Sequence, residues 1–426
     1  MLFKLTGKKS LIMFVILSFC FLWGYVTNAS ERIKYTISEP ESHPELARMQ
    51  SIPLEKAENE IRFGSSKRYE KMGVTVVLIK GSPYEMGYSR GILLQNEIRT
   101  WIKNCIENLK GRFSRAYTEK TLITRSYDIE PFVPEEFKEE LRGLSAGSGI
   151  DYRTLLIQNS VDSIGRGLSL ECTSVAVMGA DGKLLRSRNI EETDIPFFRP
   201  QMLIICQPTR GYGFAALSPP GLIVLYTGMN VNGLTLGSHS ISASSSFYET
   251  GTPGMILWRQ TIQYADSIEK AGQIIKDTQR SFQRMLLVTC AEQAAIFEFD
   301  NQKTAHIKME GDHLILTNHT RKLSIGTKTS NSIDRYDEAK SFLDQHRNKM
   351  VLKNLIELNR GDYISWAKGG PLKSVHSVIF RPSTLDFWVA IDPPPATRGK
   401  WVGFNLSKEL YGTGQDPTPQ MVPAVK

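Results

Sequence analysis

The spacing of hydrophobic and polar positions along this 426-residue chain changes near residue 172. Before that point, apolar residues recur mainly at helical spacing over 84–109, and further helices are predicted over 134–146 and 151–159. Asp151 is a good N-cap for the last of these helices. A β-rich run over 72–80 precedes them, so the first part of the chain is expected to be one strand followed by helices.

From residue 172 onward, short extended runs dominate and predict β-strands. The runs are 173–178, 183–188, 202–207, 213–217, 223–226, 234–237, 285–289, 295–299, 313–317, 374–380 and 386–391. A long amphipathic stretch over 254–278 predicts one or two helices, and another helix is predicted near 332–346. Strand runs with helix pairs between them favour a layered α+β sandwich with a largely antiparallel sheet.

The first two of these strand runs are joined by Asp181-Gly182, the strongest short signal of a β-hairpin. Cys172 stands at the head of the first strand, and the returning strand carries Arg188 and Glu191. A cysteine at the start of a strand is usually a small buried hydrophobic residue. A catalytic interpretation therefore requires a base and an oxyanion site as well.

The N-terminal region has the pattern of an export signal. Three lysines (Lys4, Lys8 and Lys9) precede an apolar run over 11–26, and Thr27-Asn28-Ala29 is a plausible cleavage site. Because the run is shorter than the roughly 20 residues of a membrane span, we expect residues 1–30 to direct export to the periplasm or the extracellular space. An uncleaved membrane anchor over 11–26 is the alternative. Residues 31–70 are polar and interrupted by prolines, which predicts a linker.

Composition narrows the function classes. The chain is 41% hydrophobic and 23% charged, as in soluble globular proteins. Its net charge of +8 is spread along the sequence, and no Lys/Arg run has interleaved aromatics, so a nucleic-acid surface is not expected. The five cysteines, of which Cys20 lies in the leader, have no paired spacing, which argues against a dense disulfide framework.

Other ways to build a site around Cys172 lack support in the sequence. His306, His313 and His319 are six to seven residues apart and lack a helical HExxH pattern, so no metal site is expected. No P-loop or strand-linked GxGxxG occurs, and the residues around Cys172 do not match papain-like enzymes. If the Glu171–Cys172 bond is cut, however, the new α-amine has a pKa near 8 and can act as a base near neutral pH.

Five short motifs then occur in the order found in one enzyme family. They are Gly81-Ser82-Pro83-Tyr84-Glu85-Met86-Gly87 with Arg90-Gly91, the segment ELRGLSAGSG over 140–149, Cys172-Thr173-Ser174, Leu316-Thr317-Asn318-His319, and Ser332-Ile333-Asp334-Arg335-Tyr336. On these motifs the chain resembles, over roughly residues 72–410, the isopenicillin-N acyltransferase-like (acyl-coenzyme A:6-aminopenicillanic acid acyltransferase) family of N-terminal-nucleophile cysteine hydrolases. Choloylglycine hydrolases are more distantly similar. The resemblance implies a four-layer αββα sandwich with mainly antiparallel sheets.

The resemblance also implies a division of the chain at Cys172. Residues 71–171 would form a helical α-chain (pro) segment, and residues 172–426 a β-chain that begins with the nucleophile. Cys172 would first attack the carbonyl of Glu171 and then serve as the catalytic nucleophile through a thioester.

Further roles follow residue by residue from the same resemblance. Arg188 matches an arginine beside the thiol. Glu191 stands where relatives usually carry Asp, in contact with the freed amine, and Asp194 is a substitute for it. Asn318 matches an asparagine near the oxyanion and the amine, and Arg335 matches an arginine of the site.

Two departures from the family pattern are visible. Choloylglycine hydrolases carry a second asparagine ten residues after the Asn of their Gly-Met-Asn turn, and counting from Asn230 leads to Ser240, beside His239. Either residue is a candidate oxyanion donor. The residue before the nucleophile is Glu171, where Gly is commoner in the acyltransferase branch, so an altered rate of self-cleavage is expected.

Together these implications predict an exported, self-cleaving amidohydrolase or acyltransferase. It would cleave or transfer the acyl group of a linear, non-peptide or small peptide-like C–N amide, without a metal or organic cofactor. Its partners would be a small acyl-amide substrate and, within the molecule, the associated α and β fragments, with no nucleic acid. Two alternatives remain open: a non-catalytic envelope binding protein on the same fold, and a Cys–His peptidase without self-cleavage, which requires a histidine within reach of Cys172.

Overall fold

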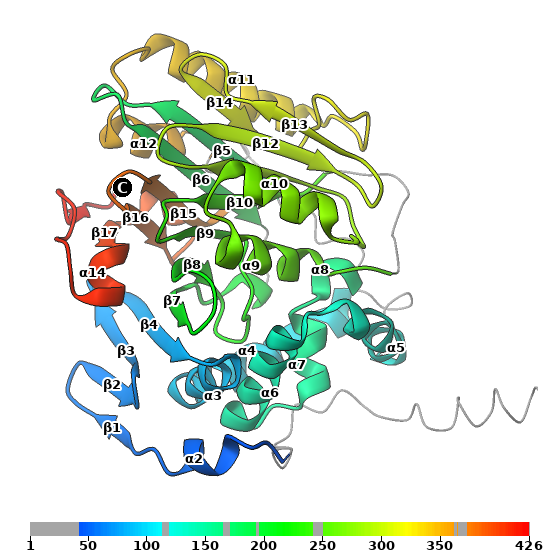
Figure 1. Cartoon of the computed structure of the whole chain (residues 1–426). Coiled ribbons are helices and arrows are strands. Elements are labelled where there is room, and N and C mark those ends of the chain that lie inside the picture. Colours follow the sequence, from blue (N-terminus) through cyan, green and yellow to red (C-terminus); the bar gives the residue numbers. More distant parts are fainter. Residues whose placement is uncertain are drawn as a thin grey trace, which may run out of the picture.

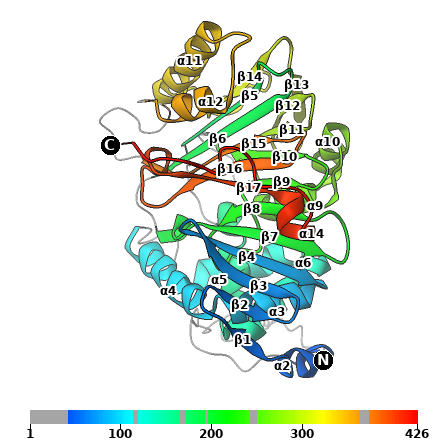
Figure 2. The same cartoon turned by 90° about the vertical axis from the view of Figure 1, so that its left-hand side faces the viewer.

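The computed structural model describes residues 42–112, 119–164, 171–192, 196–241, 250–361, 364 and 373–425. The predicted leader over 1–30, the beginning of the predicted linker and the substitute candidate Asp194 lie outside the described residues. The described chain forms two large β-sheets with helices on both sides (Figures 1 and 2).

The larger sheet has eleven strands. In spatial order they are β1 (Leu54–Lys56), β2 (Glu60–Phe63), β3 (Ser66–Lys71), β4 (Val74–Gly81), β7 (Met202–Pro208), β8 (Phe214–Ser218), β9 (Thr227–Asn230), β10 (Thr235–His239), β11 (Arg284–Thr289), β12 (Ala294–Phe299) and β13 (Thr304–Lys308). Adjacent strands are antiparallel except β4 and β7, which are parallel.

The smaller sheet has seven strands, all antiparallel to their neighbours. Their order is β14 (His313–Leu316), β5 (Glu171–Met178), β6 (Leu184–Glu192), β15 (Lys373–Arg381), β16 (Asp386–Ile391), β17 (Trp401–Asn405) and β18 (Met421–Val422). The predicted hairpin around Asp181-Gly182 is the β5–β6 pair. In its register Cys172 is opposite Ile190, Ser174 is opposite Arg188, and Glu171 is opposite Glu191.

The α-helices of the described chain lie between these strands in the sequence or before them. They are α2 (Leu46–Gln50), α3 (Pro83–Leu93), α4 (Gln95–Arg112), α5 (Glu119–Ile129), α6 (Glu135–Ser148), α7 (Tyr152–Gln158), α8 (Val161–Ile164), α9 (Gly254–Tyr264), α10 (Ile268–Asp277), α11 (Ser330–Gln345), α12 (Leu352–Asn359) and α14 (Leu406–Tyr411). The stretch predicted over 254–278 is thus two helices, and the one predicted over 84–109 is divided between α3 and α4.

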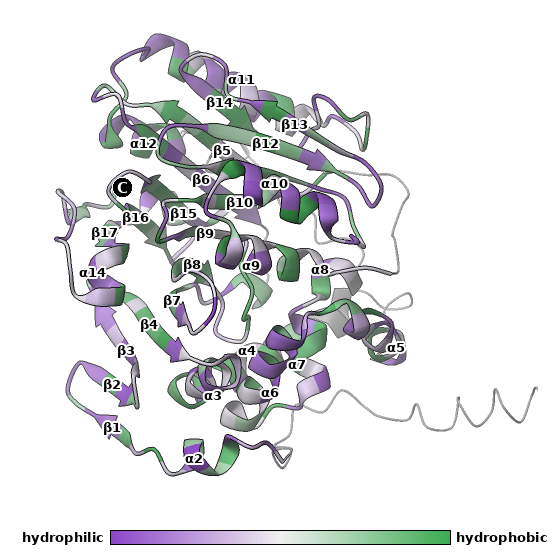
Figure 3. Ribbon diagram, in the orientation of Figure 1, coloured by the Kyte–Doolittle hydropathy of each residue, from purple (hydrophilic) through white to green (hydrophobic). Residues whose placement is uncertain are grey.

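Buried clusters define four layers. One cluster joins α3, α9 and α10 to the outer face of the eleven-stranded sheet, and another joins α11 and α12 to the outer face of the seven-stranded sheet. Two further clusters lie between the sheets. In Figure 3, α10 carries hydrophobic and hydrophilic segments side by side, as expected for a helix with one face on a sheet. The predicted αββα sandwich with mainly antiparallel sheets is confirmed.

Two of the family motifs form a close helix contact rather than a reactive site. Ser82 and Glu85 form a capping box at the start of α3. Along the same helix, Gly87 meets α6 so closely that an added Cβ would lie 1.9 Å from the carbonyl oxygen of Glu140. Gly143 of α6 would meet the carbonyl of Tyr84 at 2.1 Å. These glycines therefore allow the backbones of α3 and α6 to pack in direct contact on the outer side of the larger sheet.

The segment expected to be a polar linker has a different structure in its described part. Residues 42–70 contain α2 and the strands β1, β2 and most of β3, which extend the edge of the larger sheet. All three residues of β1 are exposed, so backbone pairing rather than apolar burial defines this edge. Polar edge strands lack the hydrophobic alternation from which strands are predicted.

Candidate active site

Cys172 begins the first hairpin strand and is completely buried. Arg188 lies opposite Ser174 on β6, so its side chain is on the same face of the sheet as the thiol. Its Nη2 lies 3.4 Å from the Cys172 sulfur and also donates to the carbonyl of Ser238. Burial raises the pKa of the Cys172 thiol to about 12, and the Arg188 charge counteracts this rise. In the continuous chain the thiol is therefore protonated, with one cation beside it.

Asn318 holds the backbone nitrogen of the same cysteine. It follows β14, which pairs with β5, and its Oδ1 accepts a hydrogen bond from the Cys172 N–H at 2.7 Å. Its Nδ2 donates to the carbonyl of Ser240 at 2.9 Å, and its own N–H donates to Ser332 Oγ at 2.8 Å. The amide side chain is thus fixed at both ends, with its oxygen directed at the nitrogen that cleavage would convert into an amine.

Arg335 reaches the site from α11. Its Nη1 donates to the carbonyl of Cys172 and to Thr173 Oγ1, the latter at 2.9 Å. Its Nη2 donates to Asn318 Oδ1 at 2.8 Å and forms an ion pair with Glu171. Because this buried guanidinium contacts both Glu171 and Cys172, it fixes the two residues of the predicted scissile bond relative to Asn318.

Glu191 is buried on the opposite face of the hairpin from the thiol, since it pairs with Glu171. Within the described residues neither of its carboxylate oxygens has a hydrogen-bond partner. Burial raises the pKa of Glu191 to about 8; nearby Glu171 adds to the rise, and Arg335 and Arg188 oppose it. The carboxyl group is therefore mostly protonated at neutral pH while the chain is continuous.

The two candidate oxyanion donors have other contacts. His239 is fully buried, with Nε2 2.8 Å from Ser174 Oγ and Nδ1 3.0 Å from the carbonyl oxygen of Thr317. The carbonyl of Ser240 accepts the hydrogen bond from Asn318. Both ring nitrogens of His239 thus have partners, one two residues after Cys172 and the other directly before Asn318 in the chain.

The other fully buried histidine, His376, does not supply a base for the thiol. Its ring contacts Thr227 Oγ1 at 3.2 Å and Gln201 Oε1 at 3.1 Å. Within the described chain, the side-chain hydrogen bond recorded for the Cys172 sulfur comes from Arg188. The geometry therefore does not favour the Cys–His peptidase alternative.

Three contacts of the site were not predicted from the sequence. Thr173 and Ser332 support Arg335 and Asn318, respectively, and the Ser238 carbonyl holds Arg188. Thr173 and Ser332 do lie inside the quoted motifs, so the motifs carried a signal for them. Ser238 acts through its backbone, which no side-chain pattern reveals.

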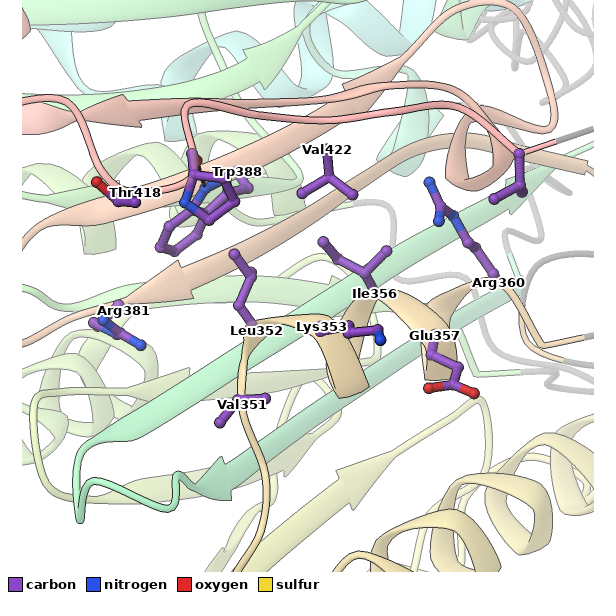
Figure 4. Close-up of a pocket in the computed structure, with 12 residues that line it drawn as sticks. Val351, Leu352, Lys353, Ile356, Glu357, Arg360, Arg381, Trp388, Thr418 and Val422 are labelled. Atoms are coloured by element: carbon purple, nitrogen blue, oxygen red, sulfur yellow. Dashed lines mark hydrogen bonds between the residues drawn. The ribbon is translucent and has the colours of Figure 1, made fainter.

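A separate cavity of about 710 Å³ lies on the outer side of the smaller sheet (Figure 4). Leu352 and Ile356 of α12 point into it toward Trp388 and Val422, and none of its lining residues belongs to the predicted site.

Among the described residues, no cluster of His, Cys, Asp or Glu is suited to hold a metal ion. In the same part of the chain, no helix combines the length and apolarity needed to span a bilayer.

Comparison with known families places part of this chain beside one enzyme family. The family model described as acyl-coenzyme A:6-aminopenicillanic acid acyl-transferase matches residues 194–395. The matched region includes His239, Ser240, Asn318 and Arg335. It begins after Cys172, Arg188 and Glu191, so it does not test the nucleophile.

Curated relatives align with only part of their own length. An uncharacterized protein of Archaeoglobus fulgidus is 26% identical over 245 residues, which is 51% of this chain and 41% of that protein. Protein dcd1B of Dictyostelium discoideum is 26% identical over 234 residues, 49% of this chain and 46% of that protein. The matched regions thus span about half or less of these relatives.

Three solved structures are similar to this chain at lower sequence identity than the curated relatives. An N-acylethanolamine-hydrolyzing acid amidase ortholog from Caenorhabditis elegans has a TM-score of 0.41 at 12% identity, covering 50% of this chain and 93% of that one. A variant of conjugated bile acid hydrolase from Clostridium perfringens has a TM-score of 0.45 at 9% identity, covering 58% and 95%. Penicillin V acylase from Agrobacterium tumefaciens has a TM-score of 0.43 at 14% identity, covering 57% and 89%.

The family match bears on the last two of the five motifs and on none of the first three. It covers the Thr317-Asn318-His319 segment and the start of α11 at Arg335, two of the five motifs. The resemblance to the acyl-coenzyme A:6-aminopenicillanic acid acyl-transferase family is therefore confirmed over residues 194–395 of this chain.

Proposed function

We propose that this protein is a self-cleaving cysteine amidohydrolase or acyltransferase that acts on C–N amide bonds with Cys172 as its nucleophile. One observation carries the proposal. The sulfur and the backbone nitrogen of Cys172 each contact a polar side chain, Arg188 at 3.4 Å and Asn318 at 2.7 Å. Any buried backbone N–H needs an acceptor, but a buried structural cysteine needs no cation at its sulfur, whereas an N-terminal nucleophile uses both atoms.

Self-cleavage would start from the continuous chain. The Cys172 sulfur attacks the carbonyl carbon of Glu171, a C–S bond forms, and the C–N bond to Cys172 breaks. The thiol proton ends on the departing nitrogen, which becomes the α-amine. Water then adds to the thioester, so that Glu171 gains a carboxylate and Cys172 regains its thiol. Arg335 contacts both residues and would hold the scissile bond in place during these steps.

The mature site would repeat the chemistry on a substrate. The α-amine of Cys172 accepts the thiol proton, and the thiolate attacks the acyl carbon of the amide. Asn318 stabilises the tetrahedral oxyanion, and the α-ammonium gives its proton to the leaving amine. The acyl group remains on sulfur as a thioester. Water releases it as an acid, or a second amine takes it in a transfer reaction.

Arg188 and Glu191 would stabilise the charged groups that form on Cys172 during this cycle. Arg188 is a buried cation at the sulfur and stabilises the thiolate. Glu191 has no hydrogen-bond partner among the described residues, and its charge influences the thiol. Once cleavage creates an α-ammonium at Cys172, an ionised Glu191 would have an opposite charge to stabilise.

The leader pattern over 1–30 supports export as part of this proposal. The substrate would be a linear, non-peptide or small peptide-like acyl amide, as the family resemblance implies; the thioester mechanism itself requires only an acyl group and a leaving amine. Purified protein should be incubated with a panel of acyl amides, and released amine should be measured. In parallel, intact mass should reveal an acyl adduct on Cys172, and Cys172→Ala should abolish both signals. A processed protein that turns over no acyl amide would favour the non-catalytic binding alternative.

A further inference from the structure

Three consecutive residues after the middle of β10 contact three different parts of the Cys172 site. The carbonyl of Ser238 accepts from Arg188, the ring of His239 contacts Ser174 and Thr317, and the carbonyl of Ser240 accepts from Asn318. We call residues 238–240 the β10 end. It belongs to the larger sheet and its continuation, whereas the hairpin that carries Cys172 belongs to the smaller one. The β10 end therefore fixes the site from across the interface between the sheets.

His239 is the side chain at the centre of this arrangement. The carbonyl oxygen of Thr317 can only accept, so Nδ1 must carry the hydrogen and donate across the 3.0 Å distance. In a neutral ring Nε2 then accepts from the Ser174 hydroxyl at 2.8 Å. One ring thereby ties the strand that begins at Cys172 to the peptide that precedes Asn318.

The surroundings of His239 keep its ring neutral, so that Nδ1 remains the donor and Nε2 the acceptor. Burial lowers the pKa of His239 well below its ordinary value, and the charges of Arg188, Arg186 and Arg335 lower it further. The ring therefore stays neutral near physiological pH. A neutral ring with one donor and one acceptor matches its two partners, a carbonyl and a hydroxyl.

We propose that His239 is a positioning residue that holds Asn318, through the Thr317 carbonyl, at hydrogen-bond distance from the Cys172 nitrogen. It acts through these neighbours and does not touch the reacting atoms. The inference rests on the proposed function of Cys172. It replaces the expectation that His239 donates to the oxyanion, because both ring nitrogens already have partners.

Four variants separate the two hydrogen bonds. His239→Ala removes both. His239→Asn places an amide N–H near the position of Nδ1 and can keep the bond to Thr317, and His239→Gln places a polar group near Nε2 and can keep only the contact with Ser174. Ser174→Ala removes only the hydroxyl. Misplacing Asn318 should slow self-cleavage and lower kcat of the mature protein by up to about 100-fold, with KM changed little.

The expected result is a large loss in His239→Ala and His239→Gln, partial recovery in His239→Asn, and a smaller effect in Ser174→Ala. His376→Ala is the matched control, because His376 is equally buried but contacts Thr227 and Gln201. It should lower thermal stability without the same loss of kcat.

Wild-type rates in folded His239→Ala or His239→Gln protein, both of which lose the bond to Thr317, would overturn the inference while leaving the proposed function intact. Equal losses in His239→Ala and His376→Ala would overturn it too, since that outcome indicates a general packing effect. A wild-type protein that neither cleaves itself nor turns over amides would remove the proposed function, and the inference with it.

Discussion

Glu171 and Glu191 lie directly opposite each other in the ladder between β5 and β6, so two carboxyl groups face the predicted cleavage point. Like charges at opposed positions of a ladder are destabilising. Burial raises the pKa of both groups, and Arg335 pairs with Glu171. The continuous chain therefore holds Glu191 mostly neutral opposite the paired Glu171, and a new α-ammonium at Cys172 would favour the ionised form of Glu191.

This arrangement predicts a pH-dependent stability of the uncut chain. The pKa of Glu191 in the folded protein, about 8, lies above the ordinary value of 4.5. The folded state thus binds the proton more tightly than the unfolded state, and stability falls as pH rises from about 4.5 to about 8. Thermal melts of Cys172→Ala protein across this range should show the fall, and adding Glu191→Gln should flatten it. An unchanged pH profile after Glu191→Gln would show that this carboxyl is not the group responsible.

Arg188 should control the reactivity of the thiol. Removing the cation in hydrogen-bond contact with the sulfur, by Arg188→Ala, should move the pH midpoint of Cys172 alkylation upward and stop self-cleavage. Arg188→Lys keeps a charge but loses the second contact to Ser238, so it should retain only part of the activity. Peptide mapping distinguishes Cys172 from Cys105, Cys206 and Cys290. The same alkylation midpoint in Arg188→Ala and wild type would contradict this role.

Asn318 should matter for catalysis more than for binding. In Asn318→Asp the acceptor for the Cys172 nitrogen remains, but the donor to the Ser240 carbonyl and to the oxyanion is lost. Loss of one oxyanion donor typically lowers kcat on the order of 100- to 1,000-fold. Steady-state kinetics should show this loss with KM within a few-fold of wild type. A change in KM alone would assign Asn318 to substrate binding.

The α3–α6 contact predicts a purely structural effect. Gly87→Ala would place a Cβ 1.9 Å from the Glu140 carbonyl, so the two helices must separate. The expected cost is about 1–3 kcal/mol, measured by denaturant unfolding of the Cys172→Ala protein. Lys138→Ala on α6 is the control, because it removes only an ion pair with the exposed Glu135 and should change stability little. Equal stability of Gly87→Ala and wild type would contradict the close approach.

The sequence predicted the hairpin because its signals are local. Asp181-Gly182 fixes the turn, and strand alternation then places Arg188 on the face of Cys172. The same alternation places Glu191 on the other face, where the charge of Arg335 acts on its carboxyl group. Turn chemistry and period-two patterns carry this information without any long-range contact.

The rest of the site depends on contacts between distant parts of the chain. Asn318 and Arg335 meet Cys172 only because β14 pairs with β5 and α11 packs behind them, so only the family motifs pointed to them. The Ser238 carbonyl and the His239 bonds come from a strand of the other sheet, and no spacing rule predicts them.

Some strands were not predicted from the sequence for similar reasons. Strands β1 to β3 are short and largely polar and lie at one end of the larger sheet, and β17 is a short run of five residues. Their structure is determined by pairing with neighbouring strands rather than by a strong local pattern.

Intact mass and N-terminal sequencing of the purified protein test the central claim most directly. The account predicts two fragments in the wild-type protein, the second beginning Cys172-Thr173-Ser174, and a single uncut chain in Cys172→Ala. A wild-type protein that stays uncut yet turns over acyl amides, or a Cys172→Ala protein that still divides at Glu171, would contradict it.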